Sequence, residues 1–298
     1  MFGGTGLVGS HLTSDLKPSR SQVDLRDIVS IRNFFRDNEF DTVINCAGNV
    51  GGLGKNLNQN LEMFVSNMEI NYNLLKVIME NPGKVKKTVM FLSTCVFPAE
   101  VEYPLTEDKL HLGPPHFSNS GYAYAKRMTQ VMADLMNESG EYGKIITVIP
   151  TNLYGPHDTF NKEDGHVIPA LIAKCFEAVK ADCALTAWGS GSPLREFLYV
   201  KDVADIIEII LDSYEGNKPL ILSHGKEVTI KEAVLTVCEA MGLTHISWDT
   251  SKPDGQHKKP SDPSALLEVI GDYKFTPLQE GVEKAVKFYQ ENYPHVRT

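Results

Sequence analysis

Short apolar runs alternate with amphipathic stretches along most of the chain, and this alternation predicts βαβ units around a parallel sheet. We expect buried strands at residues 41–47, 88–93, 145–150 and 219–223. The spacing of apolar positions predicts helices over residues 29–38, 58–80, 122–139, 167–178 and 200–213. The C-terminal third is richer in Pro and Gly, with helices expected at 230–241 and 281–292. We interpret it as a smaller domain packed on the carboxyl end of the sheet, where doubly wound folds bind ligands.

Composition narrows the class of protein. The chain has 298 residues, enough for one large α/β domain or about two domains. Hydrophobic residues make up 42% and charged residues 22%, which excludes a disordered, fibrous or small disulfide-rich protein. The 29 Lys and Arg against 38 Asp and Glu give a net charge of −9, so we expect no nucleic-acid partner.

The cysteines and the apolar segments bear on the compartment. No stretch approaches the ~20 apolar residues of a membrane span, and the amino-terminal residues lack the basic and apolar parts of a signal peptide. Five cysteines, an odd number without a C-x-x-C pair, are typical of reduced thiols rather than disulfides or a zinc site. We therefore expect a cytoplasmic protein with no membrane partner and no metal.

A glycine-rich loop stands at the start of the sequence. Its residues are Gly3, Gly4, Thr5, Gly6, Leu7, Val8 and Gly9. Glycines let the backbone approach a pyrophosphate, and we expect the loop to open a helix through residues 10–12 whose first amides would bind that anion. The alternative is a plain glycine-rich turn. Only Met1 and Phe2 precede the loop, so the strand in front of it is expected to be cut to two residues.

A second pattern, Tyr-x-x-x-Lys, falls on the expected helix at 122–139. Tyr122 and Lys126 are four residues apart and share one helix face. A free Tyr has a pKa near ~10, and a neighbouring cation favours its ionised form. Ser93 ends an expected strand, where its hydroxyl can hold a carbonyl or oxyanion. The alternatives are an exposed Lys, a half-buried Tyr and a strand-end cap.

In this order and spacing, the glycine loop, the serine and Tyr-x-x-x-Lys resemble the extended, nucleotide-sugar branch of the short-chain dehydrogenase/reductase superfamily. Further motifs are similar to the family of GDP-L-fucose synthases, which are GDP-4-keto-6-deoxy-D-mannose 3,5-epimerase/4-reductases. These motifs lie at residues 49–52, 92–98, 150–158, 165–171, 188–191, 195–197 and 252–255. The resemblance covers nearly the whole chain. Its most specific segments are Ser-Thr-Cys at 93–95 and Gly-His-Val-Ile-Pro at 165–169.

The resemblance implies a fold and an activity. It implies an α/β protein with a Rossmann-type doubly wound parallel sheet and a smaller C-terminal α/β substrate domain. The NADP-binding domain would comprise residues 1–153 and 195–224, and the substrate domain residues 154–194 and 225–298. The enzyme would convert GDP-4-keto-6-deoxy-D-mannose to GDP-L-fucose with NADPH. The implied catalytic residues are Ser93, Tyr122, Lys126, Cys95 and His166.

The chemistry gives Cys95 and His166 a reason to be paired. A 4-keto group acidifies the protons on C3 and C5 of the sugar, and inverting those centres needs a base on one face and an acid on the other. Cys and His, with free pKa values of ~8.5 and ~6.5, can each hold or lose a proton near neutrality. Read without the family, Cys95 is a small buried hydrophobic residue and His166 a helix cap.

The resemblance also implies the binding residues. Those for NADP(H) are the glycine loop 3–9, Arg20, Lys126, Pro150, Thr151, Asn152, Leu153 and His166. Those for the GDP-sugar are Lys174, Trp188, Arg195 and Asp254. A pyrophosphate is bound well by Lys and Arg, and an aromatic wall suits planar or apolar surface. Residues 17–21 are basic and hydroxyl-rich at the place where an NAD enzyme would have an acidic residue on the ribose, which agrees with NADPH. The alternative is that these residues form a solvated polar loop.

Association and two rival functions remain open. The helices at 58–80 and 122–139 have more apolar surface than is needed to cover one face of the sheet. The surplus favours a homodimer in which each subunit contributes these two helices. The alternative is that both helices bury a broad apolar stripe within their own subunit. One rival is a related epimerase or reductase for another nucleotide sugar, which would dispense with the Cys95/His166 pair. The other is a catalytically impaired NADP-binding regulator. It is favoured by the truncated strand at the amino end. The interval from Gly9 to Asp27 is also too short for a full helix, a loop and a second strand.

Overall fold

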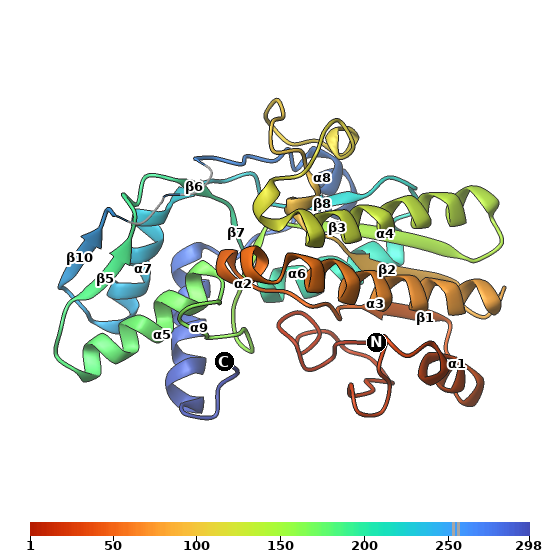
Figure 1. Ribbon diagram of the computed structural model, residues 1–298, viewed down its shortest axis with the longest axis horizontal. Helices are drawn as coiled ribbons and strands as arrows, with labels where there is room; N and C mark the ends of the chain where they lie inside the picture. The colour runs from red at the N-terminus through yellow and green to blue at the C-terminus, as the bar shows by residue number, and fades with distance from the viewer. Residues whose placement is uncertain (252–253, 255–256) are drawn as a thin grey trace.

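The centre of the molecule is a four-stranded parallel sheet in the order β1-β2-β3-β8 (Figure 1). The computed structural model describes residues 1–251, 254 and 257–298. The strands are β1 (Thr42–Asn45), β2 (Lys87–Phe91), β3 (Lys144–Pro150) and β8 (Leu220–Leu222). Val89 of β2 pairs with Ile44 of β1 on one side and Ile146 of β3 on the other. Phe2 adds a single parallel bridge to Asn45, so the strand in front of the glycine loop is as short as expected.

Helices cover both faces of this sheet. One face packs Ile44, Val89 and Ile146 against α6 (Val200–Ser213) and α8 (Ser264–Ile270). The opposite face packs Val43, Met90 and Ile145 in a second core. That core also contains residues of α1 (Ile28–Asp37), α3 (Asn60–Glu80) and α4 (Ser120–Ser139). Residues alternate between the faces because successive side chains of a strand point to opposite sides. The doubly wound, Rossmann-type sheet is confirmed.

The C-terminal part has its own core. It packs α5 (Val167–Lys180), α7 (Ile230–Met241) and α9 (Leu278–Asn292) with the parallel pair β5 (Leu185–Trp188) and β10 (Ile246–Asp249) (Figure 1). Thr229 and Glu232 form a reciprocal capping box at the start of α7. Leu266 of α8 packs in the core with α6. The exact division of the chain into two domains stays a prediction.

Several short elements join the two parts. Strand β4 (Asn152–Tyr154) pairs in parallel with β7 (Phe197–Tyr199), and β6 (Leu194–Arg195) pairs antiparallel with β9 (Val228–Thr229). Three 3₁₀ turns follow β2, at Thr94–Val96, Glu107–Lys109 and Phe117–Asn119. The helix expected at 58–80 is α3, which begins at Asn60. Gln59, where φ is −126°, separates it from the short helix α2 (Leu53–Asn58). The motif residues Lys252, Pro253 and Gly255 lie outside the described residues.

The helix expected after the glycine loop is wrong. Residues 3–12 form successive turns, with hydrogen bonds from Gly6 N to Gly3 O, from Ser10 N to Gly6 O and from His11 N to Val8 O. The Lys17 ammonium donates to Leu12 O at 2.6 Å, which takes a carbonyl that a continuing helix would need for itself. The following residues, up to Asp27, also lie in turns and loops, and no second strand forms among them.

Two absences apply to the part of the chain that the structure describes. Within it, no helix combines the length and the apolar character that crossing a membrane requires. The same residues contain no group of three or more His, Cys, Asp or Glu side chains placed to hold a metal ion.

Candidate active site

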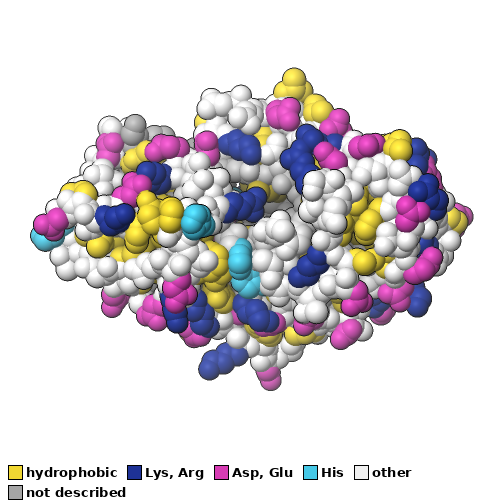
Figure 2. All heavy atoms as spheres, turned by 90° about the horizontal axis from the view of Figure 1, so that it is seen from below, with side chains coloured by type: hydrophobic (Ala, Val, Ile, Leu, Met, Phe, Trp, Pro, Cys, Tyr) yellow, Lys and Arg dark blue, Asp and Glu magenta, His cyan; other side chains and the backbone are white. Residues whose placement is uncertain are grey.

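The loops that leave the carboxyl ends of β2 and β3 carry the predicted site residues Ser93, Cys95 and Thr151. These ends lie at one edge because the strands are parallel. Seen from below, the surface is hollowed near its middle, and histidine and basic side chains border the hollow (Figure 2). We describe the catalytic candidates first and then the two binding regions.

Tyr122, Lys126 and Ser93 are brought together as expected. Tyr122 and Lys126 are only 8% and 3% exposed, although both belong to a helix that covers the sheet. The Lys126 ammonium donates to Phe91 O at 2.7 Å and lies 5.8 Å from the centre of the Tyr122 ring. A side-chain hydrogen bond joins Tyr122 to Ser93. The alternative of an exposed lysine on this helix is therefore wrong.

Burial decides the protonation of this pair. Desolvation raises the pKa of the Tyr122 phenol, the nearby Cys95 adds to the rise, and the hydrogen bond with Ser93 works against it. The lowering that we expected from a neighbouring cation is thus outweighed. Burial also lowers the pKa of Lys126 to about 8, with Cys46 acting in the opposite direction. Tyr122 therefore holds its proton at neutral pH and is suited to donate it.

Cys95 is fixed by the same serine. Ser93 caps the 3₁₀ turn at Thr94–Val96, and its hydroxyl oxygen accepts a hydrogen bond from Cys95 N at 3.3 Å. The Cys95 side chain is half-buried rather than enclosed in the core. Its neighbour Val96 is fully buried and anchors the turn. Cys95 and Tyr122 are close enough for their charges to interact.

Lys259 is a site residue that the sequence patterns did not single out. It is half-buried, and burial lowers the pKa of its ammonium. Cys95 raises this pKa and Arg195 lowers it. The charges of Cys95 and Arg195 are therefore close enough to Lys259 to act on it. In sequence, Lys259 follows Lys258 in a polar segment and looks like part of a solvated run. Only the tertiary fold shows otherwise.

A buried carboxylate holds the segment that carries Lys259. Glu196 is 3% exposed and accepts hydrogen bonds from Ser223 Oγ at 2.8 Å, from Ser261 N at 2.9 Å and from Ser261 Oγ at 2.5 Å. These donors lie directly after β8 and in the segment after Lys259, whereas Glu196 itself directly precedes β7. Glu196 therefore ties that segment to the central sheet.

His166 directly precedes α5, but its imidazole makes no capping hydrogen bond. The helix-cap interpretation of this residue is thus wrong. The side chain reaches solvent, yet surrounding protein lowers its pKa by desolvation. The loop before it is docked on the loop after β1, because Gly52 N donates to Asp164 O at 2.7 Å. A Cβ at Gly52 would lie 2.9 Å from the carbonyl oxygens of both Asp164 and Gly165, so this contact requires glycine.

An asparagine joins the loop after β1 to α3 and α4. Asn67 is fully buried, accepts from Asn49 N at 3.1 Å and donates to Asn49 O at 2.9 Å. A Cβ at Gly48 would lie 3.7 Å from the Lys126 ammonium. The loops bearing residues 48–52 and 164–166 are thereby connected to the Tyr122/Lys126 helix.

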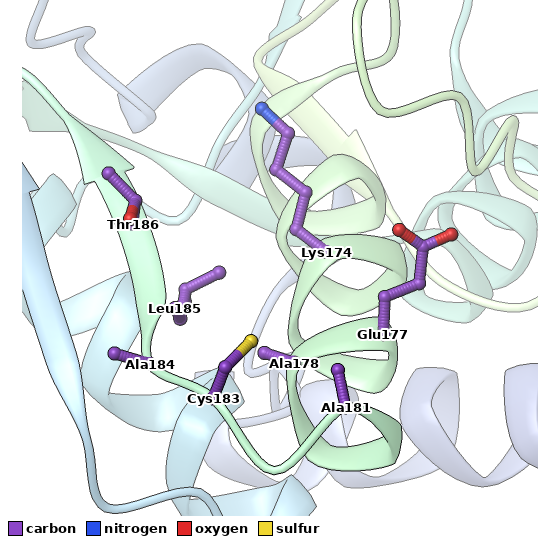
Figure 3. A pocket seen from close by; sticks show the side chains of 8 residues that line it. All are labelled: Lys174, Glu177, Ala178, Ala181, Cys183, Ala184, Leu185 and Thr186. Carbon is purple, nitrogen blue, oxygen red and sulfur yellow. The ribbon is translucent and has the colours of Figure 1, made fainter.

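The candidate substrate residues fall into two places. The Lys174 ammonium lies 4.1 Å from the centre of the Trp188 ring, a cation–π contact. Trp188 is 49% exposed, so it is not a core residue. Lys174 also lines a shallow cavity of about 330 Å³ with Glu177 and Cys183 (Figure 3). Arg195 is half-buried, donates to Leu194 O at 2.7 Å and faces Lys259.

Asp254 joins the loop that follows Trp188. Its carboxylate accepts from Ser190 N at 2.6 Å and from Ser190 Oγ at 2.8 Å. These bonds lower the pKa of Asp254 and place it beside the turn at Gly189, where a Cβ would lie 2.4 Å from the carboxylate.

The glycine loop keeps an open position. Gly3 has φ +76°, and a Cβ there would lie 2.6 Å from Ala47 N; a Cβ at Gly9 would lie 2.3 Å from Gly3 O. Those two glycines serve the loop's own packing. A Cβ at Gly6 would meet only Gly3 O at 3.4 Å and Arg297 Nη1 at 3.6 Å. Within the described chain, the amides of Thr5, Leu7 and Val8 donate to no protein oxygen. Such a loop fits an anion such as a pyrophosphate.

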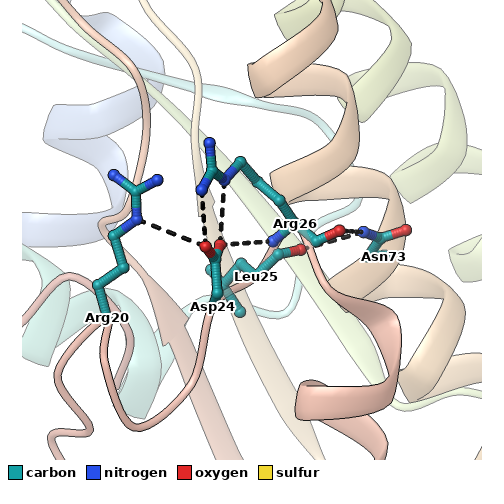
Figure 4. A network of polar contacts seen from close by, with 5 residues as sticks. All are labelled: Arg20, Asp24, Leu25, Arg26 and Asn73. Carbon is teal, nitrogen blue, oxygen red and sulfur yellow. Dashed lines mark hydrogen bonds and ion pairs between the residues drawn. The ribbon is translucent and has the colours of Figure 1, made fainter.

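Arg20 lies in the segment that follows the glycine loop. It is 71% exposed and lies 3.6 Å from Asp24, which also receives a 2.7 Å bond from Arg26 (Figure 4). Both arginines lower the pKa of Asp24. Asn73 of α3 donates to the carbonyl oxygens of Leu25 and Arg26 at 3.1 and 3.0 Å, and so fixes the segment.

The predicted cofactor residues after β3 are also anchored. Thr151 N donates to Leu222 O at 3.2 Å, and Asn152 donates to Glu196 O through its backbone and its side chain. Pro150 ends β3, and Leu153 packs partly into the core beside α6. These residues form a rigid edge at the end of the sheet.

Comparison with known proteins identifies the family to which the chain belongs. The family described as NAD dependent epimerase/dehydratase matches residues 1–223. The chain belongs to this family. It is 41% identical over 310 residues to the GDP-L-fucose synthase of Dictyostelium discoideum, covering 99% of the chain and 96% of that protein. It is 31% identical over 316 residues to the Escherichia coli GDP-L-fucose synthase, covering 99% and 97%.

A solved structure gives the same answer. The crystal structure of a GDP-L-fucose synthetase from Naegleria fowleri bound to NADP matches with a TM-score of 0.91 and 36% identity. The match covers 100% of the chain and 95% of that protein. The resemblance to GDP-L-fucose synthases inferred from the motifs is therefore confirmed.

Proposed function

We propose that this chain converts GDP-4-keto-6-deoxy-D-mannose to GDP-L-fucose, by epimerising C3 and C5 and then reducing C4 with NADPH. The observation that carries the proposal is the grouping of Ser93, Tyr122 and Lys126 with a half-buried Cys95 at the end of β2. A related nucleotide-sugar enzyme that moves no proton at C3 or C5 would not need Cys95. The NADP in the Naegleria fowleri structure and the names of the relatives support the same reading.

For the reduction, NADPH supplies a hydride to C4. Tyr122 gives its phenolic proton to the C4 oxygen, and Ser93 holds that oxygen by a hydrogen bond. Burial suits Tyr122 to this work, because its raised pKa keeps the phenol protonated until the oxygen becomes basic. Lys126, held at Phe91 O, is positioned to contact the nicotinamide ribose.

For the epimerisation, Cys95 and His166 act on the acidic C3 and C5 positions. Cys95 acts as the base on one face, and His166 in its protonated form returns a proton to the other. Desolvation lowers the His166 pKa, which makes that form a stronger acid although less populated at neutral pH. Ser93 fixes the backbone of Cys95, and no capping bond occupies the His166 ring. Both side chains are therefore available to substrate.

The binding roles follow the same division. The glycine loop 3–9 holds the pyrophosphate of NADPH, Arg20 its 2′-phosphate, and residues 150–153 with His166 border the nicotinamide. Lys174, Trp188, Arg195 and Asp254 hold the GDP-sugar. The cation–π pair of Lys174 and Trp188 offers a positive charge beside a planar wall, which suits a nucleoside diphosphate.

Two finer features complete the proposal. The chain acts in the cytoplasm as a homodimer, and α3 and α4 form the interface. Leu61, Val65, Tyr72, Tyr124, Met128 and Leu135 are the exposed large apolar side chains of these two helices, between 41% and 76% exposed. Such a surface is typical of a contact between copies.

One experiment separates this proposal from its rivals. Pure protein is incubated with GDP-4-keto-6-deoxy-D-mannose and NADPH in D₂O, and the product is examined by NMR. The proposal expects loss of NADPH absorbance and GDP-L-fucose carrying deuterium at C3 and C5. A reduced sugar without deuterium at these carbons would indicate a different nucleotide-sugar reductase. NADPH binding without turnover would indicate a regulator.

A further inference from the structure

The chain returns to its amino-terminal loop after α9. Phe160 N donates to Arg297 O at 2.7 Å, which fixes the backbone of the segment that follows α9. The Arg297 guanidinium then reaches the glycine loop, and Nη1 would lie 3.6 Å from a Cβ at Gly6. Figure 1 likewise shows the carboxyl end near the loops of the amino end. Residues almost a whole chain apart thus meet at Gly6.

The guanidinium is not engaged elsewhere. Within the described residues, no side-chain hydrogen bond or ion pair of Arg297 is formed. Arg297 and Asp158 interact electrostatically, but Asp158 Oδ1 accepts from Thr159 N at 2.7 Å, and its Oδ2 is buried without a hydrogen-bond partner among the described residues. Burial raises the pKa of Asp158 to about 7, with Arg297 acting the other way. The carboxylate therefore neutralises Arg297 only in part near neutral pH.

The glycine loop itself supplies no cation. Residues 3–9 contain no Lys or Arg. The Lys17 ammonium, which packs beside Gly4, donates to Leu12 O at 2.6 Å and to Gly9 O at 3.4 Å. The loop offers amide donors and an open position at Gly6, but a dinucleotide pyrophosphate carries two negative charges. An arginine above that position matches them in charge and geometry.

We propose that Arg297 binds the pyrophosphate of the dinucleotide cofactor across Gly6, and so clamps the segment after α9 onto the glycine loop. This inference rests on the cofactor site of the proposed function. It adds a ligand from the segment after α9 to a glycine loop that stands at the opposite end of the chain. Cofactor binding would then tie the two parts of the molecule together.

The test measures dinucleotide binding rather than turnover. Dissociation constants of NADPH and NADH are measured by fluorescence for the wild type and for Arg297→Ala, Arg297→Lys and Lys287→Ala. Lys287 is the matched control, since it is an exposed cation of α9 that pairs with Glu291. We expect Arg297→Ala to weaken both dinucleotides by the same factor, ~10–100-fold, the usual value of a charge-assisted bond. Arg297→Lys should recover part of this loss, and Lys287→Ala should change nothing.

A second readout checks the clamp itself. Trypsin cleaves after Arg297, and cleavage of the bond between Arg297 and Thr298 is followed by mass spectrometry. Saturating NADPH should slow this cleavage in the wild type. Unchanged or tighter binding in Arg297→Ala, a loss confined to NADPH, or cleavage indifferent to NADPH would each overturn the proposal. A wild type that binds NADPH through Arg297 but turns over no GDP-sugar would sink the proposed function and leave this inference standing.

Discussion

The ammonium of Lys126 donates a 2.7 Å hydrogen bond to the carbonyl of Phe91, the last residue of β2. This bond crosses from α4 to the sheet and fixes the helix beside the point where Ser93 and Cys95 begin their turn. It also keeps a lysine almost completely buried, one helical turn from Tyr122. The buried position lowers the pKa of Lys126 to about 8, and this has consequences that can be measured.

Activity should fall as Lys126 loses its proton. The ammonium is present below pH ~8 and is lost above it, so the single-turnover reduction should decline above about pH 8. In Lys126→Met, reduction should be weak and this decline should be absent. A wild-type rate that stays level to pH ~10, the range of a free lysine, would show that the ammonium is not required.

The same pKa shift predicts a pH dependence of stability. The unfolded chain holds this proton to pH ~10.4, whereas the folded protein releases it at about 8. Between these values the unfolded state binds more protons at this residue, so the contribution of Lys126 to the free energy of unfolding should rise with pH. Urea unfolding at pH 7 and pH 10 measures the change. It should be smaller in Lys126→Met than in the wild type.

Tyr122 should be needed for reduction and not for epimerisation. Tyr122→Phe removes the hydroxyl that protonates the C4 oxygen, and we expect a loss of ~10²–10⁴ in the reduction rate. Exchange of the C3 and C5 protons with solvent should continue, because we assign it to Cys95 and His166. Stopped-flow absorbance of NADPH and NMR in D₂O follow the two steps separately. Wild-type reduction in the variant would remove Tyr122 from the mechanism.

Substitution of Cys95 or His166 should impair epimerisation. Cys95→Ser keeps the size of the side chain, but a hydroxyl ionises far above neutral pH, so deuterium uptake at C3 and C5 should collapse. His166→Gln should impair the same exchange. NADPH affinity should stay close to the wild type in Cys95→Ser. Exchange at wild-type rates in both variants would contradict the epimerase assignment.

The sequence predicted the framework well because strong periodic signals are local. Runs such as 145–150 and the long helices were recognisable from their own residues. The helix after the glycine loop was predicted wrongly, because the Lys17 contact that ends it comes from a side chain outside the motif. Lys259 and Arg297 were missed for a similar reason. Each looks like an ordinary surface cation, and only contacts made by distant segments bring it to the site.

Glu196 should contribute strongly to stability. Glu196→Ala would leave buried donors of Ser223 and Ser261 without an acceptor, which costs ~1–3 kcal/mol for each group. It would also release the segment that carries Lys259. Urea unfolding measures the loss, and Glu208→Ala, an exposed acid of α6, is the matched control. A free energy of unfolding equal to the wild type would show that the carboxylate is not needed to hold this segment.

The exposed apolar surface of α3 and α4 predicts association. Leu74 and Leu75 of α3 are fully buried in the subunit, whereas Leu61 remains 76% exposed and Leu135 of α4 62% exposed. Charging this surface should therefore break a dimer without disturbing the core. In sedimentation at micromolar concentration, we expect the wild type at twice the 33.1 kDa chain mass and Leu135→Glu as a monomer. Leu235→Glu changes a leucine of α7 that is 47% exposed, and it should stay dimeric. Because α4 carries Tyr122, the monomeric variant should also reduce more slowly; a fully active wild-type monomer would contradict both the interface and its support of the site.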